Sequence, residues 1–481
     1  MSCVDKPTEH SMRIELARLV GAEHVLAAPA RSPYNSDMTR RRGLRGRADA
    51  VALPASAQEV EAVVRWCYAH DVPLVPRGGG TGLTGGAVPT QGGVVLSLER
   101  LRAVRELRPQ LWRMLPEAGV RTRDVQRLAR ENGLFFGPDP GASEQSQIGG
   151  NVATNAGGAH ALKYGVTGAW VTGLEAVLAP GELVHVGGWG RKDVAGYDLK
   201  NLLIGSEGTL GVITAVRLRL LPAREAQIAQ VVFVRTRAEG CAAMLRVLAA
   251  GMEAAAMDFA DGAALAHVAG GYPGEVPHGA GFALLMEVDG THEQARAQAD
   301  ELRELLGDGA LAIDRPRDAA ALWRWRDGFN GVLSGVRGAK VSEDVSFPVE
   351  RLQEGLERFE ELAARRGLSS CAFGHGGDGN VHATVLVDPA DDAELDRARA
   401  LGEELFALVG ELGGSIAAEH GVGWLKRGLL ASQWDARAVA LHEQIKRAFD
   451  PKGLLNPGKK LARPPHAGAA DDERPPARGP S

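Results

Sequence analysis

The segment that decides the fold is Val72-Pro-Leu-Val-Pro-Arg-Gly-Gly-Gly-Thr-Gly-Leu-Thr-Gly-Gly86. Its first residues are apolar and predict a short buried strand, and the small residues after them predict a loop. Upstream, Ser56 precedes apolar residues at helical spacing, and an apolar stretch at residues 49–54 comes before that helix. A strand, a helix and a second strand in this order open an α/β domain.

This loop is not the turn of a nicotinamide-binding Rossmann domain. It contains Gly80-x-Gly82-x-x-Gly85, which matches the dinucleotide pattern, but residues 87–93 cannot form the helix that a Rossmann turn must enter. Small residues after a strand can instead direct their backbone N–H groups at a diphosphate, and Arg77 would add positive charge. A plain flexible loop is the alternative.

Two further glycine clusters follow. The first covers residues 139–158 and continues to Gly165, and the second is Ile204-Gly-Ser-Glu-Gly-Thr-Leu-Gly-Val-Ile213. Glycine accounts for 62 of the 481 residues, roughly 13% against a usual share of about 7%. Clustered glycine indicates backbone that closely approaches another group.

The three clusters, in this order, resemble the flavin domain of the vanillyl-alcohol oxidase and p-cresol methylhydroxylase superfamily over residues 46–222. The resemblance implies FAD, and it implies non-covalent binding because Thr81 stands where covalently linked members have His. Gln147 stands where Ser or Thr is usual. The implied FAD-binding residues are Pro76, Arg77, Gly78, Gly79, Gly80, Thr81, Gly82, Gly85, Asp139, Ile148, Gly149, Gly150, Asn155, Gly157, Gly158, Tyr164, Gly165, Glu207, Gly211, Val212, Ile213 and Asn456.

Composition excludes several classes of protein. The net charge is −5, with 24% charged and 44% hydrophobic residues, which indicates neither nucleic-acid binding nor general disorder. The four cysteines form no Cys-x-x-Cys pair, so iron–sulfur ligation finds no support. With no long apolar run and no signal-peptide core, we expect a cytoplasmic protein with no integral membrane segment, and peripheral contact with the inner membrane stays open.

The chain is expected to form an α+β protein in several parts. The predicted parts are an N-terminal segment at 1–45, a two-subdomain FAD-binding domain at 46–222, a substrate and metal domain at 223–430, a segment at 431–463 that returns to the flavin domain, and a disordered tail at 464–481. In the substrate domain, apolar strands at 228–234 and 282–288 alternate with a charged helix at 292–306, which predicts an antiparallel sheet.

A pair of histidines lies in residues 371–387, where two apolar runs flank Asp378-Gly379. Asp-Gly favours a two-residue type I′ hairpin, which would place His375 opposite His382 with Cβ atoms about 5 Å apart. Two isolated histidines would more often be structural. However, residues 415–421 supply Glu419 beside His420, and two histidines with one carboxylate suit Zn²⁺, Mn²⁺ or Fe²⁺.

The motifs Gly374-His-Gly-Gly-Asp-Gly-Asn-Val-His382, Glu419-His-Gly-Val-Gly423 and Phe449-Asp-Pro-Lys-Gly-Leu-Leu-Asn-Pro-Gly458 resemble the signatures of FAD-linked D-2-hydroxy-acid dehydrogenases. The resemblance implies the metal ligands His375, His382 and Glu419, the catalytic base His420, and the substrate-binding residues Arg326, Lys340 and Thr384. Thr384 stands where 2-hydroxyglutarate members usually have Asn.

The implied reaction oxidises D-lactate, glycolate or D-2-hydroxyglutarate to the 2-oxo acid by metal-assisted deprotonation and hydride transfer to flavin N5. A non-redox transferase like the alkyl-dihydroxyacetone-phosphate synthases is one alternative, against which Glu419 argues, and a flavin-carrying electron-transfer subunit is another. The electron acceptor stays open among a quinone, a cytochrome, an electron-transfer flavoprotein and an iron–sulfur subunit. A homodimer is also left open.

Overall fold

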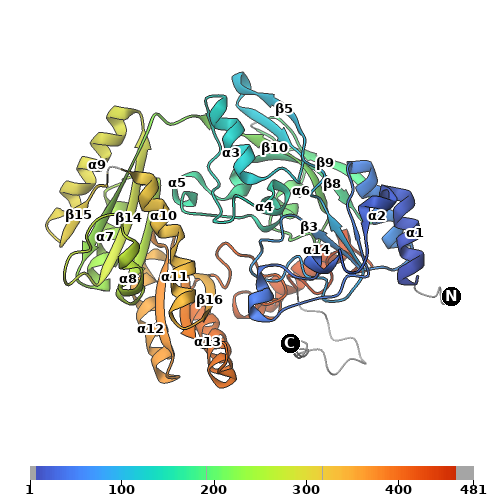
Figure 1. The fold of residues 1–481 in the computed structure, drawn as a ribbon. Coiled ribbons are helices and arrows are strands. Elements are labelled where there is room, and N and C mark those ends of the chain that lie inside the picture. The colour runs from blue at the N-terminus through green and yellow to red at the C-terminus, as the bar shows by residue number, and fades with distance from the viewer. Residues whose placement is uncertain (1–6, 191, 317, 462–481) are drawn as a thin grey trace.

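The structure is a computed structural model that describes residues 7–190, 192–316 and 318–461. The tail predicted at 464–481 lies outside these ranges. Residues up to 222 build a four-stranded, a five-stranded and a two-stranded sheet, and the following residues build one large sheet beside them (Figure 1). Strand β11 (Leu221–Pro222) ends and β12 (Ala226–Val234) begins on either side of the predicted boundary.

The first sheet has four strands and carries the loop that decides the fold. Its order is β1 (Val25–Leu26), β2 (Ala50–Ala52), β4 (Val94–Ser97), β3 (Leu74–Arg77), with β2 and β3 parallel to β4. Helices α1 (Glu9–Val20) and α2 (Ala57–Ala69) bury Leu16, Val60 and Val64 against it. The predicted cap is present, because Ser56 accepts the N–H of Glu59.

The second sheet is antiparallel. Its order is β5 (Val104–Arg108), β6 (Arg113–Pro116), β10 (Val212–Arg219), β8 (Val171–Leu178), β9 (Glu182–Gly187). The same part of the chain also forms the helices α3 (Thr122–Glu131), α4 (Ile148–Thr154), α5 (Ala161–Tyr164) and α6 (Leu199–Leu203). It also forms the two-stranded pair of β7 (Leu134–Phe135) and β11. The second and third glycine clusters lie at α4 and just before β10, so all three clusters gather where the two sheets meet.

The third sheet has seven strands, all paired antiparallel as expected. Its order is β15 (Ala312–Asp314), β12, β14 (Phe282–Gly290), β13 (Ala256–Asp261), β17 (Ser369–His375), β18 (Asn380–Val387), β16 (Ala339–Ser346). One face packs on α7 (Arg237–Ala249), α9 (His292–Gly307), α12 (Leu352–Arg365) and α13 (Asp392–Glu411). The other packs on α8 (Gly262–Val268), α10 (Ala319–Asp327) and α11 (Phe329–Val336).

The chain then returns to the first sheet through α14 (Ala436–Phe449). Leu455 forms a parallel bridge with Leu74, and the Asn456 side chain donates to the carbonyls of Gly86 and Glu207. The end of the described chain thus lies beside the first glycine loop. No helix within the described ranges is long and apolar enough to cross a membrane.

Candidate active site

The first glycine loop forms a groove with free hydrogen-bond donors. The backbone N–H groups of residues 78–82 donate to no acceptor among the described residues. A Cβ on Gly79 would lie 2.2 Å from the Gln145 carbonyl oxygen, so only glycine fits between the loop and the second cluster. A glycine-rich loop with free N–H groups after a strand is the kind of segment expected to bind a diphosphate.

Two buried acceptors face this loop without partners. Gln147 Oε1 lies 3.6 Å from the Cβ position of Gly78, and Asp37 Oδ2 lies 3.7 Å from that of Gly82. An unpartnered buried oxygen is costly unless a ligand supplies a donor. The ribityl and ribose hydroxyl groups of FAD are such donors, so the residues present fit this cofactor.

The other glycine-cluster residues named from the sequence line the same junction. Asn155 has a left-handed backbone and accepts the N–H of Gly168. Gly157 lies against Glu419, because a Cβ there would be 3.3 Å from Glu419 Oε2. The remaining residues lie in β3 (Pro76), in the loop after β3 (Thr81, Gly85), at the start of α4 (Ile148, Gly149, Gly150), beside α5 (Gly158, Gly165) and at the start of β10 (Gly211, Val212, Ile213).

Three charged side chains named for FAD binding have protein partners instead. The Arg77 guanidinium donates to the carbonyl of Ser36 behind Gly80. Asp139 accepts from His160, and the Glu207 carboxylate accepts the N–H groups of Val422 and Gly423. A fourth residue, Tyr164, donates its hydroxyl to Asp289. These side chains therefore brace the walls of the groove.

The three predicted metal ligands and the predicted base lie together. The Nε2 atoms of His375, His382 and His420 lie 3.7, 3.5 and 3.5 Å from Glu419 Oε1. The rings of His382 and His420 stack with centroids 5.4 Å apart. Three imidazole nitrogens around one carboxylate oxygen form a donor set that suits a divalent transition metal.

The predicted hairpin geometry is wrong in its turn and its register. Residues 376–378 form a 3₁₀ turn, and only Gly379 of the Asp-Gly pair has positive φ, at 77°. His382 pairs with Phe373 instead of His375. The histidines still share a face of the sheet because His375 is two residues beyond Phe373, and their ring centroids are 5.8 Å apart.

Asp344 joins this cluster and was not assigned a role from the sequence. Its ligand atom and those of His382, Glu419 and His420 lie within 4.8 Å of one another. Asp344 Oδ2 also accepts the backbone N–H groups of residues 418, 419 and 420, at 3.1, 3.0 and 2.9 Å. This carboxylate thus holds the loop that presents Glu419 and His420. It follows Glu343 in an ordinary strand, and no spacing in the sequence signals it.

The predicted substrate-binding residues lie beside the cluster. Arg326 and Lys340 both lie near the ring of Phe373, with the guanidinium carbon 5.7 Å and Nζ 5.1 Å from its centroid. The Phe373 ring is 5.1 Å from that of His382. Thr384 is fully buried. Its hydroxyl lies 2.8 Å from Ser342 Oγ and donates to the His382 carbonyl.

Electrostatics separate His382 from the other two histidines. Burial lowers the pKa of His375, but Asp258 and Glu419 raise it well above the ordinary value. Burial lowers the pKa of His382 to about 3, which keeps this ring neutral. Burial also disfavours the charged form of His420, but Asp344 and Glu419 raise its pKa above the ordinary value. Burial opposes ionisation of Glu419, yet His375 and His420 hold the pKa of this carboxyl well below its usual range.

Comparisons with known proteins match both parts of the chain. Residues 48–187 match the FAD binding domain family and residues 223–460 match the family described as FAD linked oxidases, C-terminal domain. Glycolate oxidase subunit GlcD of Bacillus subtilis (strain 168) is 35% identical over 86% of this chain and 89% of that protein. The chain belongs to the FAD-linked 2-hydroxy-acid dehydrogenase family. It is an FAD-linked oxidoreductase of 2-hydroxy acids.

Other relatives span the same family. The probable mitochondrial D-lactate dehydrogenase of Danio rerio is 32% identical over 86% of this dehydrogenase and 84% of that protein. D-2-hydroxyglutarate dehydrogenase of Stutzerimonas stutzeri (strain A1501) is 31% identical over 95% of this chain and 100% of that protein. The fold is that of p-cresol methylhydroxylase with substrate bound, with a TM-score of 0.78 and 19% identity over 94% of this chain and 97% of that one. It is also that of alkyldihydroxyacetonephosphate synthase, with a TM-score of 0.73 and 18% identity over 94% of this chain and 86% of that one.

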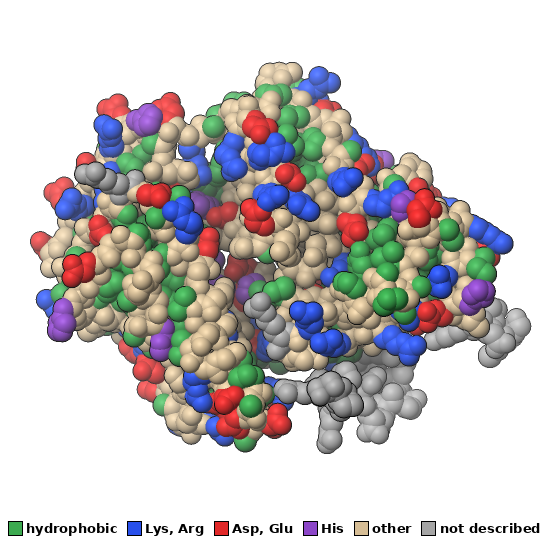
Figure 2. All heavy atoms as spheres, viewed as in Figure 1, with side chains coloured by type: hydrophobic (Ala, Val, Ile, Leu, Met, Phe, Trp, Pro, Cys, Tyr) green, Lys and Arg blue, Asp and Glu red, His purple; other side chains and the backbone are tan. Residues whose placement is uncertain are grey.

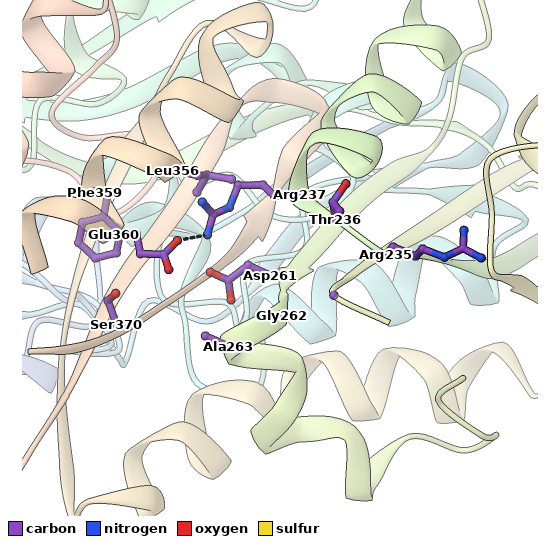
Figure 3. Close-up of a pocket in the computed structure, with 11 residues that line it drawn as sticks. Arg235, Thr236, Arg237, Asp261, Gly262, Ala263, Leu356, Phe359, Glu360 and Ser370 are labelled. Atoms are coloured by element: carbon purple, nitrogen blue, oxygen red, sulfur yellow. Dashed lines mark hydrogen bonds and ion pairs between the residues drawn. The ribbon is translucent and has the colours of Figure 1, made fainter. Parts of the chain in front are cut away.

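The surface of this dehydrogenase carries no dominant charge on the face shown in Figure 2, where acidic and basic side chains are interspersed. A hollow of about 230 Å³ lies away from the histidine cluster, at the far end of β13 (Figure 3). There Arg237 pairs with Glu360 above Asp261. The lining contains two arginines and two carboxylates, so their formal charges cancel, although Arg235 points away from the two acids in Figure 3.

Proposed function

We propose that this protein oxidises a D-2-hydroxy acid to the 2-oxo acid, with non-covalent FAD in the glycine groove and a divalent cation at His375, His382 and Glu419. The observation that carries the proposal is the contact between the two sites. Glu419 directs Oε1 at three imidazole nitrogens, while its Oε2 lies against Gly157 of the second glycine cluster. A substrate held at the cluster therefore lies beside the flavin groove.

The chemistry that the two groups supply is simple. When bound, FAD would supply a hydride acceptor, and a divalent cation would lower the pKa of a nearby hydroxyl by several units. The donor set supports Zn²⁺, with Mn²⁺ and Fe²⁺ as alternatives. Thr81 supports non-covalent FAD, because its side chain lacks the imidazole of covalently linked members.

The remaining steps belong to the chain's own residues. His420 would take the hydroxyl proton, since its Nε2 faces the cluster, 3.5 Å from Glu419 Oε1. Arg326 and Lys340 would bind the substrate carboxylate, since both charged groups lie near the ring of Phe373. With base, carboxylate anchor and flavin groove at fixed positions, only one enantiomer directs its α-hydrogen at the flavin.

The electron acceptor and the alternatives belong to the same proposal. The electron acceptor would be a quinone, a cytochrome, an electron-transfer flavoprotein or an iron–sulfur subunit. The geometry of the histidine cluster favours none of these over the others. A non-redox transferase on the same scaffold is disfavoured by Glu419, whose carboxylate completes a metal-type donor set. A subunit that only transfers electrons would not require the histidine and carboxylate donors that could bind a cation.

The test is anaerobic mixing of the purified yellow protein with D-lactate, glycolate, D-2-hydroxyglutarate and the L-acids. One D-acid, or achiral glycolate, should bleach the flavin absorbance, and a chelator should abolish bleaching while FAD stays bound. Acid precipitation should release all the flavin. Bleaching by an L-acid alone, or bleaching unaffected in a protein shown to be free of metal, would contradict the proposal.

A further inference from the structure

Asp258 is a buried carboxylate to which the sequence analysis gave no role. It lies on β13 with 1% of its surface exposed. In the antiparallel pairing of β13 with β17 it stands directly opposite His375. Residues in this position have Cβ atoms about 5 Å apart, so a short carboxylate reaches the facing imidazole.

This carboxylate binds two members of the site at once. Asp258 Oδ1 accepts a hydrogen bond from His375 Nδ1 at 2.8 Å, and Asp258 Oδ2 accepts one from Arg326 Nε. Arg326 Nη2 in turn lies 3.4 Å from His375 Nδ1. One side chain therefore ties the imidazole to the guanidinium.

The bond to His375 determines which ring nitrogen can bind a cation. When Nδ1–H donates to a carboxylate, the lone pair of the neutral ring is on Nε2. Nε2 is the atom that faces Glu419 Oε1, at 3.7 Å. A carboxylate behind a ligand histidine fixes the orientation of the ring and makes it a better ligand.

The bond to Arg326 keeps a buried charge in place. This residue is 9% exposed and lies among apolar side chains of α10 and β17, next to Phe373. A guanidinium taken out of water is stable only with a paired acid. Without Asp258 the guanidinium would turn away from the position beside the cluster.

We propose that Asp258 is a positioning residue that serves two parts of the site, orienting Nε2 of His375 toward the cation and holding the Arg326 guanidinium for the substrate carboxylate. It touches neither the reacting atoms nor the predicted flavin groove. The inference rests on the proposed cation site, and it adds one residue on which both cation and substrate binding depend.

The same strand offers a matched control. Asp261 lies three residues further along β13, is also buried, and accepts the backbone N–H groups of Ala264 and Ala372, both at 2.8 Å. An offset of three places it on the opposite face of the sheet, in the hollow of Figure 3. Removing its charge tests what the loss of any buried acid on β13 does.

The experiment compares wild type, Asp258→Asn, Asp261→Asn and Arg326→Lys. Cation retention is measured by elemental analysis against rising chelator concentration, and binding of the 2-oxo acid by perturbation of the flavin spectrum at saturating cation. We expect Asp258→Asn to bind the cation about 10–100-fold more weakly and the 2-oxo acid more weakly too, with FAD content unchanged. Arg326→Lys should weaken only acid binding, and Asp261→Asn neither.

Other outcomes separate the two proposals. Equal cation retention in Asp258→Asn and wild type, or an equal loss in Asp261→Asn, would overturn the positioning role. If Asp258→Asn does not fold, Asp258→Glu moves the carboxylate outward and should show the same double loss. A wild type that binds no cation contradicts the proposed function instead, and the acid-binding measurement then still reports on Arg326.

Discussion

At the scale of single residues, His420 has two contacts that suit a base, the Nε2 contact to Glu419 and the nearby Asp344. We predict that His420→Ala slows flavin reduction by the preferred acid about 10²- to 10⁴-fold, the usual contribution of a general base. Rapid-mixing absorbance with saturating substrate measures this rate. The cation should be retained, so loss of metal together with rate would show that His420 is a ligand instead.

Gly157 provides a test of the contact between groove and cluster. A Cβ on this residue would lie 3.3 Å from Glu419 Oε2 and 3.4 Å from Glu419 Cβ, so Gly157→Ala must displace the carboxylate. We expect weaker cation retention and slower flavin reduction with FAD still bound. Gly141→Ala, in the same glycine cluster but with nothing within 4 Å, is the control. Equal behaviour of the two variants would contradict the contact.

Thr384 is the residue at which substrate choice can be examined. Its hydroxyl is engaged by Ser342 and the His382 carbonyl, which leaves it poorly placed to bind a distant second carboxylate. We therefore expect preference for a short acid over D-2-hydroxyglutarate. Thr384→Asn, close in volume, should raise kcat/KM for D-2-hydroxyglutarate relative to D-lactate. A steady-state comparison with a dye acceptor measures the ratio, and an unchanged ratio would contradict the assignment.

At the scale of elements, the hairpin of β17 and β18 shows where local signals stop being sufficient. Asp378-Gly379 is a strong turn signal, yet Phe347, just after β16, donates its N–H to the Gly379 carbonyl and fixes a longer turn. That contact joins residues 32 positions apart, and no local pattern contains it. The helix at 292–306 and the strands at 228–234 and 282–288 were predictable because their apolar spacing decides their conformation locally.

The same turn yields a prediction about stability. Gly379 has φ 77°, and a Cβ there would lie 1.9 Å from the Phe347 carbonyl oxygen. Gly379→Ala should lower the free energy of unfolding by more than about 1 kcal/mol, because both the backbone conformation and the space are lost. Denaturant unfolding measures the loss. Gly367→Ala, at a turn with positive φ but open space, should cost less.

The site itself was predictable only in part. His375, His382, Glu419 and His420 could be found because their motifs are contiguous. Asp258 could not, since its partners are 68 and 117 residues away and an aspartate in a strand carries no signal of its own. The resemblance supplied Arg326 and Lys340, which spacing alone would not have selected.

At the scale of the whole molecule, a buried polar network joins the FAD-binding domain to the seven-stranded sheet. His160, beside α5, lies between Asp139 of the second glycine cluster and Glu287 of β14, with Nε2 3.0 Å from Glu287 Oε1. Lys163 donates to Asp289 at 2.8 Å in the same interface. Trp323 donates to Glu287 from α10, the helix that also carries Arg326. The interface thus connects the flavin groove with the substrate anchor.

This network makes the stability of the domain pairing depend on pH. Burial alone would lower the pKa of His160, but Asp139 and Glu287 raise it to about 10. A histidine whose pKa is raised on folding stabilises fully below its unfolded value near 6.5, and this contribution is lost as the pH rises through 10. We therefore expect His160→Gln to lower Tm most at pH 6 and progressively less toward pH 10. His185→Gln, which removes a half-exposed histidine paired with Glu175, is the control and should change Tm little. If the Tm difference between wild type and His160→Gln stays constant from pH 6 to 10, the imidazole stabilises by packing. That result would contradict a stabilising ion pair between the two domains at His160.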